Sequence, residues 1–155
     1  MLPWIKLDEA TVPGGGALRL MQRGGEFSIM SGTIELMNSR LSGSEEQLAT
    51  LSAARIAGHK APRVLIGGLG MGFTLRAALH SFGAGCEIMV AELVPEVVAW
   101  ALGPLNAIHG ASLDDPRVKL HEGDVATAIG GSRPFDAILL DVDNGPDGLS
   151  RPAND

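Results

Sequence analysis

The chain has 155 residues, of which 45% are hydrophobic, and a formal net charge of −6. This length is typical of one domain, and the apolar content is enough for a core, which excludes a disordered chain. The acidic balance and the scattered basic residues argue against a nucleic-acid-binding protein. No apolar stretch has the ~18 residues that a membrane span requires. A single cysteine, Cys86, and the absence of a signal-peptide pattern predict a cytoplasmic protein.

Residues 1–42 are predicted to form a small β meander. Strands are expected at 17–21, 26–30 and 33–37, with hairpin turns at the glycine-containing pairs 24–25 and 31–32. The tract Pro-Gly-Gly-Gly at 13–16 is expected to be a flexible segment leading into the first strand. A meander of this size is too small to be stable alone, so we expect it to pack on the rest of the chain.

Residues 43–155 are predicted to form a Rossmann-like α/β domain. The expected elements are, in order, a helix from Ser42 or Ser44 to about 57, strand 63–67, helix 71–82, strand 87–92, helix 95–107, strand 117–122, helix 124–129 and strand 135–140. Continuous apolar strands alternating with helices indicate a parallel sheet covered on both faces. The polar, turn-rich segment that follows predicts a C-terminally truncated sheet, whose free edge a homodimer could cover.

A glycine-rich turn follows the first predicted parallel strand. Gly68, Gly70 and Gly72 stand between this strand and a helix. Such a turn places backbone N–H groups at a helix N-terminus, and glycine lets a ligand come close to them. A dinucleotide fingerprint requires a glycine where this chain has Phe73 or Leu75, so glycines spaced by one favour a mononucleoside. A strand-to-helix turn without any ligand is the alternative.

Four acids follow the predicted strands at the edge where α/β sheets bind ligands: Glu92, Asp124, Asp141 and Asp143. Glu92 can accept hydrogen bonds from both ribose hydroxyls, or it is an ordinary exposed acid. Asp124 can accept from an adenine amino group, cap the short helix that follows, or do both. Asp141 and Asp143 suit a cationic ligand, such as a sulfonium nucleoside or an amine. The alternative for Asp141 is a residue that forms a turn and binds nothing. The four histidines lack metal-ligand spacing, so no metal site is expected.

These segments together resemble the spermidine synthase family and, more broadly, the class I S-adenosylmethionine-dependent methyltransferases. The resemblance covers about residues 26–148. It rests on Gly-Leu-Gly-Met-Gly-Phe-Thr-Leu-Arg at 68–76, on Glu92, on Asp-Pro-Arg-Val at 115–118 with Gly123-Asp124, and on Phe-Asp-Ala-Ile-Leu-Leu-Asp at 135–141. It implies S-adenosylmethionine or its decarboxylated form as cofactor. It also implies aminopropyl transfer to an amine, with Asp141 or Asp143 as catalytic base.

Three departures concern the acceptor half of this resemblance. Met71 stands where the family has an aspartate that helps hold the amine, and Ala49-Thr50 replaces a Tyr-His pair. The segment from Asp141 to Pro146 also departs from the family's Asp-x-x-Asp-Pro. Three functions are therefore open: aminopropyl transfer in polyamine biosynthesis, methyl transfer to an unknown acceptor, and nucleoside binding without catalysis. The loss of a negative charge at Met71 slightly favours methyl transfer.

Overall fold

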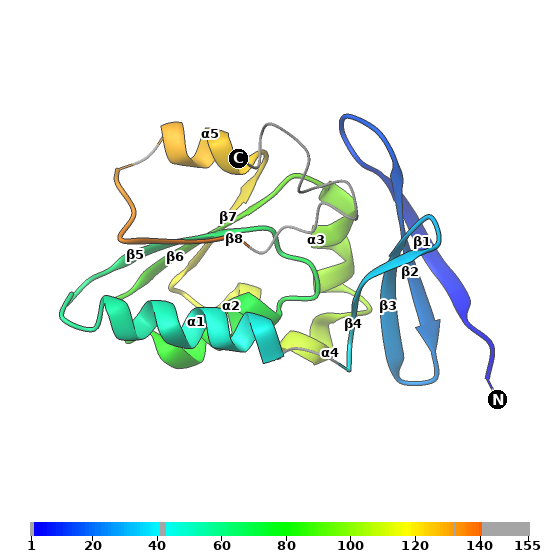
Figure 1. The fold of residues 1–155 in the computed structure, drawn as a ribbon, viewed down its shortest axis with the longest axis horizontal. Helices are drawn as coiled ribbons and strands as arrows, with labels where there is room; N and C mark the ends of the chain where they lie inside the picture. The colour runs from blue at the N-terminus through cyan, green and yellow to red at the C-terminus, as the bar shows by residue number, and fades with distance from the viewer. Residues whose placement is uncertain (1, 41–42, 132, 141–155) are drawn as a thin grey trace.

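The structure, a computed structural model, describes residues 2–40, 43–131 and 133–140. It contains an antiparallel and a parallel sheet, each of four strands (Figure 1). The elements are β1 Ile5–Thr11, β2 Ala17–Arg23, β3 Glu26–Ser31, β4 Ile34–Asn38, α1 Gly43–Arg55, β5 Arg63–Gly67, α2 Phe73–Ser81, β6 Glu87–Glu92, α3 Pro95–Leu102, α4 Asn106–His109, the 3-10 helix η1 Ser112–Asp114, β7 Val118–Glu122, α5 Val125–Gly130 and β8 Ala137–Leu140.

The N-terminal sheet has the strand order β1-β2-β3-β4 and is antiparallel throughout. Its last three strands were expected, whereas β1 was not. The 13–16 tract, expected to lead into the first strand, is instead the turn between β1 and β2. The Val12 amide donates to the Gly16 carbonyl and the Gly15 amide to the Val12 carbonyl, both at 3.0 Å. The turn forms because β1 supplies a partner for β2 that the sequence pattern did not reveal.

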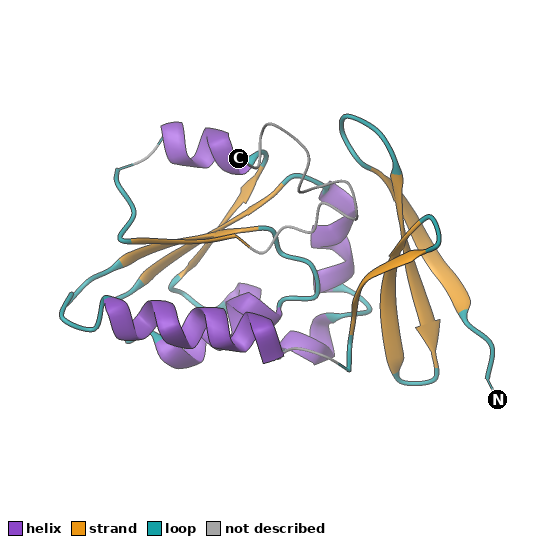
Figure 2. Ribbon diagram, in the orientation of Figure 1, coloured by secondary structure: helices purple, strands orange, loops and turns teal. Residues whose placement is uncertain are grey.

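The second sheet is parallel, with the order β7-β6-β5-β8. Helices α1 and α2 cover one face and α5 covers the other (Figure 2). Within the described part of the chain, no strand pairs with the outer edge of β8. Helix α3 stands between this sheet and the N-terminal sheet (Figure 1). The Rossmann-like α/β architecture predicted from the alternating strands and helices is confirmed.

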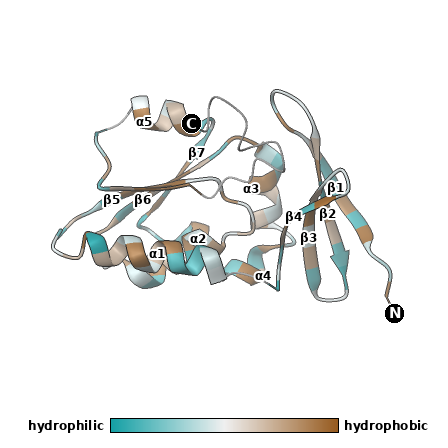
Figure 3. Cartoon of the chain, in the orientation of Figure 1, coloured by the Kyte–Doolittle hydropathy of each residue, from teal (hydrophilic) through white to brown (hydrophobic). Residues whose placement is uncertain are grey.

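Residues on both faces of the central strands are buried, as the uninterrupted apolar runs predicted. Val64 and Ile66 of β5 belong to the main core, while Leu65 between them packs under α5 with Ala91 and Ala128. These three residues of β5 are fully buried. Figure 3 shows the hydrophobic residues of β5 and β6 lying between the helices of the two faces.

The helix expected at 95–107 is two helices, α3 and α4. Gly103 caps α3, and its amide donates to the Ala99 carbonyl at 2.9 Å. Pro104 follows and cannot donate a backbone hydrogen bond, so the helix cannot continue. Helix α2 begins at Phe73 instead of residue 71, because Gly72 before it has a left-handed φ of 84°.

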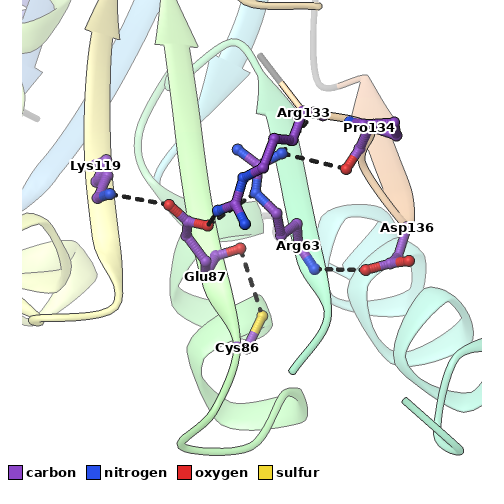
Figure 4. A network of polar contacts seen from close by, with 7 residues as sticks. All are labelled: Arg63, Cys86, Glu87, Lys119, Arg133, Pro134 and Asp136. Atoms are coloured by element: carbon purple, nitrogen blue, oxygen red, sulfur yellow. Dashed lines mark hydrogen bonds and ion pairs between the residues drawn. The ribbon is translucent and has the colours of Figure 1, made fainter. Parts of the chain in front are cut away.

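A charged network joins the strands at the edge where they begin (Figure 4). The Glu87 carboxylate pairs with Arg63 Nε at 2.8 Å, Lys119 Nζ at 3.0 Å and Arg133 at 3.4 Å. The hydrogen bond from Arg63 lowers the pKa of the Glu87 carboxyl. Asp136 accepts from the Arg63 amide at 2.7 Å, which fixes the start of β8 beside β5. This network lies at the opposite edge from the predicted site and is structural.

Candidate functional site

The predicted site lies where the parallel strands end, on the side that faces the N-terminal sheet (Figure 1). The glycine turn leaves β5 here and enters α2. Gly68, Gly70 and Gly72 all have positive φ, of 99°, 53° and 84°. The Gly68 amide donates to the Ala91 carbonyl and the Gly72 amide to the Leu69 carbonyl, both at 2.8 Å. The turn is therefore fixed to the end of β6 by its own backbone.

Glu92 is the side chain that holds this turn in place. Its Oε1 accepts a hydrogen bond from the Leu69 amide at 2.8 Å, and its Oε2 accepts from the Val94 amide at 3.0 Å. Only 8% of Glu92 is exposed, so it is not the ordinary exposed acid that the sequence left open. A carboxylate has about four lone-pair positions, so two such bonds leave capacity for the hydroxyls of a ribose.

Side chains of this chain also pack against Gly70 and Gly72, although the end of the flexible Met37 side chain can move aside while the Cβ of the buried His109 cannot. A Cβ on Gly70 would lie 2.7 Å from the Sδ of Met37, a residue of β4. A Cβ on Gly72 would lie 2.8 Å from the Cβ of His109, in α4. The sequence interpretation explained these glycines by the approach of a ligand alone. The structure adds a second reason, because distant segments contact the turn directly.

His109 is a structural residue that sequence reasoning did not single out. It is 1% exposed, and its Nδ1 accepts from the Ser112 amide at 3.0 Å. Its Nε2 lies 2.8 Å from the Ala101 carbonyl, which makes Nε2 the donor. Both ring nitrogens are thus occupied by the backbone, and the ring braces the turn at Gly72. No local sequence pattern could have revealed this contact.

Asp124 caps α5, which is one of the two roles predicted for it. Its Oδ1 accepts from the Ala126 amide at 3.1 Å, and its carbonyl accepts from Thr127 Oγ1 at 2.6 Å. Asp124 is exposed, and within the described residues its second carboxylate oxygen has no hydrogen-bond donor. The neighbouring Gly123 amide donates to the Glu92 carbonyl at 2.9 Å, so the ends of β6 and β7 are tied together. The structure therefore places Glu92 and Asp124 on adjacent strand ends.

The two predicted catalytic residues, Asp141 and Asp143, lie outside the described residues. Met71, which replaces the family's amine-binding aspartate, is fully buried in the core. Its side chain therefore lines no open crevice at the site. Within the ranges described, no group of three His, Cys, Asp or Glu residues could hold a metal ion. No helix in those ranges is long and apolar enough to cross a membrane.

A pocket of about 400 Å³ lies elsewhere, beside the C-terminal half of α2. Arg76, His80, Ser112 and Arg117 are among its lining residues. The Arg117 guanidinium is bonded to the Asp115 carboxylate, and this hydrogen bond raises the pKa of Arg117. Its remaining donors reach backbone carbonyls of the α2 end. The cation is thus occupied within the chain. The pocket adjoins the glycine turn through Arg76 and His109, which both contact Gly72, and extends from there along α2.

No family model matches the chain, and no curated protein matches it by sequence. Solved structures do match. The spermidine synthase of Thermotoga maritima has a TM-score of 0.70 and 19% identity over 93% of this chain. A spermidine synthase in complex with the transition-state analogue AdoDATO has the same TM-score and identity over 90% of this chain. A protein of Klebsiella pneumoniae described as an O-methyltransferase has a TM-score of 0.50 and 25% identity over 71% of this chain and 49% of its own.

The chain has the fold of the S-adenosylmethionine-dependent methyltransferases. It spans about half the length of the spermidine synthases it matches, 49% of one and 47% of the other. The resemblance predicted from the glycine run and the downstream acids is therefore confirmed at the level of the fold.

Proposed function

We propose that this chain is the nucleoside-binding part of a spermidine-synthase-like transferase, which binds S-adenosylmethionine or its decarboxylated form. The observation that carries the proposal is the buried Glu92 carboxylate, held by the Leu69 and Val94 amides at the end of β6. A fixed carboxylate at this position is suited to the two hydroxyls of a ribose. We assign Asp124, on the adjacent strand end, to accept a hydrogen bond from the adenine amino group, because its second carboxylate oxygen is not used by the helix cap.

The backbone of the glycine turn fits the other end of such a ligand. Within the described residues, the amides of Gly70 and Met71 donate no hydrogen bond, and they directly precede Gly72, the N-cap of α2. Free amides at a helix N-terminus favour a negative group, such as the carboxylate of a methionine moiety. A bound sulfonium would supply a carbon activated toward a nucleophile. The chain's own part is to hold the nucleoside in one orientation, which lowers the barrier to attack.

For aminopropyl transfer, an amine nitrogen forms a bond to the carbon beside the sulfonium while the carbon–sulfur bond breaks. Methylthioadenosine leaves, and the nitrogen gives up a proton. We propose Asp141 or Asp143 as the base that receives it, because both follow β8 in the sequence and β8 runs parallel to the strand that ends in Glu92. The acceptor would be a small-molecule amine, as in polyamine biosynthesis.

Methyl transfer is the second candidate, and one specific observation favours it. Met71 is apolar and fully buried where spermidine synthases have an amine-binding aspartate. The acceptor site of an aminopropyltransferase therefore lacks one of its acids. A methyltransferase has no need of a carboxylate there, since its acceptor is not required to be a cation.

Calorimetry with three ligands tests the proposal and separates the two candidates. Methylthioadenosine, S-adenosylhomocysteine and S-adenosylmethionine are titrated into the protein. In a separate assay, product formation from putrescine and decarboxylated S-adenosylmethionine is followed by mass spectrometry. Tighter binding of methylthioadenosine, together with an aminopropylated product, supports aminopropyl transfer. Tighter binding of S-adenosylhomocysteine supports methyl transfer. If none of the three binds, both candidates are wrong.

A further inference from the structure

In the part of the chain that the structure describes, one buried side-chain oxygen has no hydrogen-bond partner. Among the described side chains, Glu96 Oε2 is the buried polar atom that receives no donor. Leaving a buried carboxylate oxygen unpaired costs about 1–3 kcal/mol or more, because its hydration is lost and nothing replaces it. Glu96 lies in the first turn of α3, where the helix dipole favours a negative charge. That favourable field still provides no hydrogen bond to Oε2.

Glu96 lies close in sequence to the predicted nucleoside site. Helix α3 begins at Pro95, shortly after Glu92 at the end of β6. Glu96 and Trp100 are one helical turn apart and therefore share a face of α3. Trp100 Nε1 donates to Asp8 Oδ2 of β1 at 2.8 Å. The face that carries Glu96 and Trp100 therefore points toward the N-terminal sheet, and α3 lies between that sheet and the parallel sheet (Figure 1).

Three other described acids of this region accept hydrogen bonds. Asp8 accepts from Trp100, Glu92 accepts from two backbone amides, and Asp124 accepts from the amide of Ala126. Glu122 is exposed, so water can satisfy its carboxylate, whereas the buried Oε2 of Glu96 still requires a donor. As a residue Glu96 is only partly buried, whereas its Oε2 is buried, so a ligand's donor reaches Oε2 when the Glu96 side chain turns toward it.

We propose that Glu96 binds a primary ammonium group of a ligand held at this edge. A cation with N–H donors meets both needs of the site, since it neutralises the carboxylate and gives Oε2 its missing hydrogen bond. A compact ammonium fits an enclosed oxygen better than a planar guanidinium, which requires a flat, open approach. A metal ion is a poor occupant, because no third ligand for it is present in the described ranges.

This inference rests on the proposed function, because the ammonium is expected on the nucleoside or on its acceptor. Glu96 then takes over the cation-binding role that position 71 has lost, since Met71 is apolar and fully buried. Two sources of the ammonium are compatible with this chemistry. It can belong to the aminopropyl arm of decarboxylated S-adenosylmethionine or to the acceptor amine.

Calorimetry on the full chain and its Glu96→Gln variant tests the inference with three probes. Methylthioadenosine carries no ammonium, decarboxylated S-adenosylmethionine carries one on its aminopropyl arm, and putrescine is titrated at saturating methylthioadenosine. We expect Glu96→Gln to weaken at least one ammonium-bearing probe by about tenfold or more, as loss of a charge-assisted hydrogen bond predicts. The probe that weakens identifies the source of the ammonium. Binding of methylthioadenosine should be unchanged.

Two controls keep a folding defect apart from a binding defect. Glu122→Gln removes an exposed acid at the end of the neighbouring strand β7 and should leave all three probes unchanged. Glu96→Gln should melt close to the temperature of the unaltered protein, because Oε2 makes no hydrogen bond that could be lost and only the interaction of the charge with the helix dipole is removed. If methylthioadenosine binds and both ammonium probes keep their affinity in Glu96→Gln, the Glu96 inference alone is wrong. If the unaltered chain does not bind methylthioadenosine, the proposed function falls and the inference falls with it.

Discussion

The carboxylate of Glu92 receives the amide hydrogen of Leu69 at 2.8 Å, so the end of β6 fixes the turn that follows β5. The same carboxylate receives the Val94 amide, which starts the connection to α3. One acid therefore positions both loops that surround the predicted nucleoside site. A site prepared in this way loses little conformational entropy when a ligand binds.

Replacement of Glu92 should lower stability as well as affinity. Glu92→Ala leaves two buried amides without an acceptor, and each unpaired amide costs about 1–3 kcal/mol. We expect the free energy of unfolding to fall by about 2–5 kcal/mol. Glu92→Gln keeps one acceptor oxygen and should lose about half as much. Urea unfolding measures both variants, with Glu122→Ala as an exposed control that should stay near the unaltered value.

A stability loss in Glu92→Ala close to that of Glu122→Ala would contradict the bracing role. Affinity is compared below the temperature at which either variant begins to unfold. Under those conditions, Glu92→Ala should weaken methylthioadenosine by about 1–3 kcal/mol, because ribose hydroxyls lose their acceptor.

The contact between Gly72 and His109 predicts a costly Gly72→Ala substitution. The positive φ of 84° costs about 1–2 kcal/mol for alanine, and a Cβ 2.8 Å from the His109 Cβ adds an overpacking cost of about 1–3 kcal/mol. Gly110→Ala is the matched control, since its φ is +64° and a Cβ there meets nothing within 4 Å. Thermal unfolding of both variants separates the two costs. Equal losses would show that the His109 contact does not constrain the turn.

The network around Glu87 predicts a specific dependence of stability on pH. Its folded-state pKa is lowered from the ordinary 4.5, chiefly by the hydrogen bond from Arg63. The stabilisation is therefore complete above pH 4.5 and is lost as the pH falls through the folded-state pKa. Glu87→Gln should be less stable than the unaltered protein at pH 7, and the difference should close below pH 4.5. Urea unfolding across this range checks it, and a difference that stays constant with pH would contradict the assignment.

Much of the fold could be predicted from local patterns. The apolar runs that became β5 and β6 are long and uninterrupted, and the glycines between β5 and α2 mark the turn. Strand β1 was missed because most of it is exposed. Its first five residues are all exposed, and Ala10 is its one buried residue, so the strand has no buried face that the sequence could reveal. Its position comes from pairing with β2, which is a tertiary contact. The break between α3 and α4 could have been predicted from Gly103-Pro104.

The sequence identified residues of the candidate site, but it did not reveal the contacts that hold them in place. Glu92 and Asp124 were found from their places after strands, and Asp124 caps α5 as its sequence position allowed. The bracing of Gly70 by Met37 and of Gly72 by His109 depends on residues far away in the chain. The uncompensated oxygen of Glu96 has no sequence signal at all, because any acid in a first helical turn is expected to be satisfied by its helix.

The most direct measurement of the central claim is a titration of the isotope-labelled protein with methylthioadenosine, followed by amide NMR shifts. The account predicts saturable shifts at the amides of residues 68–73, at Glu92 and at Asp124, with little change at His80 or Arg117, which line the pocket beside the C-terminal half of α2. Shifts confined to that pocket, or no shifts at all at millimolar ligand, would contradict the assignment of the nucleoside site to the glycine turn.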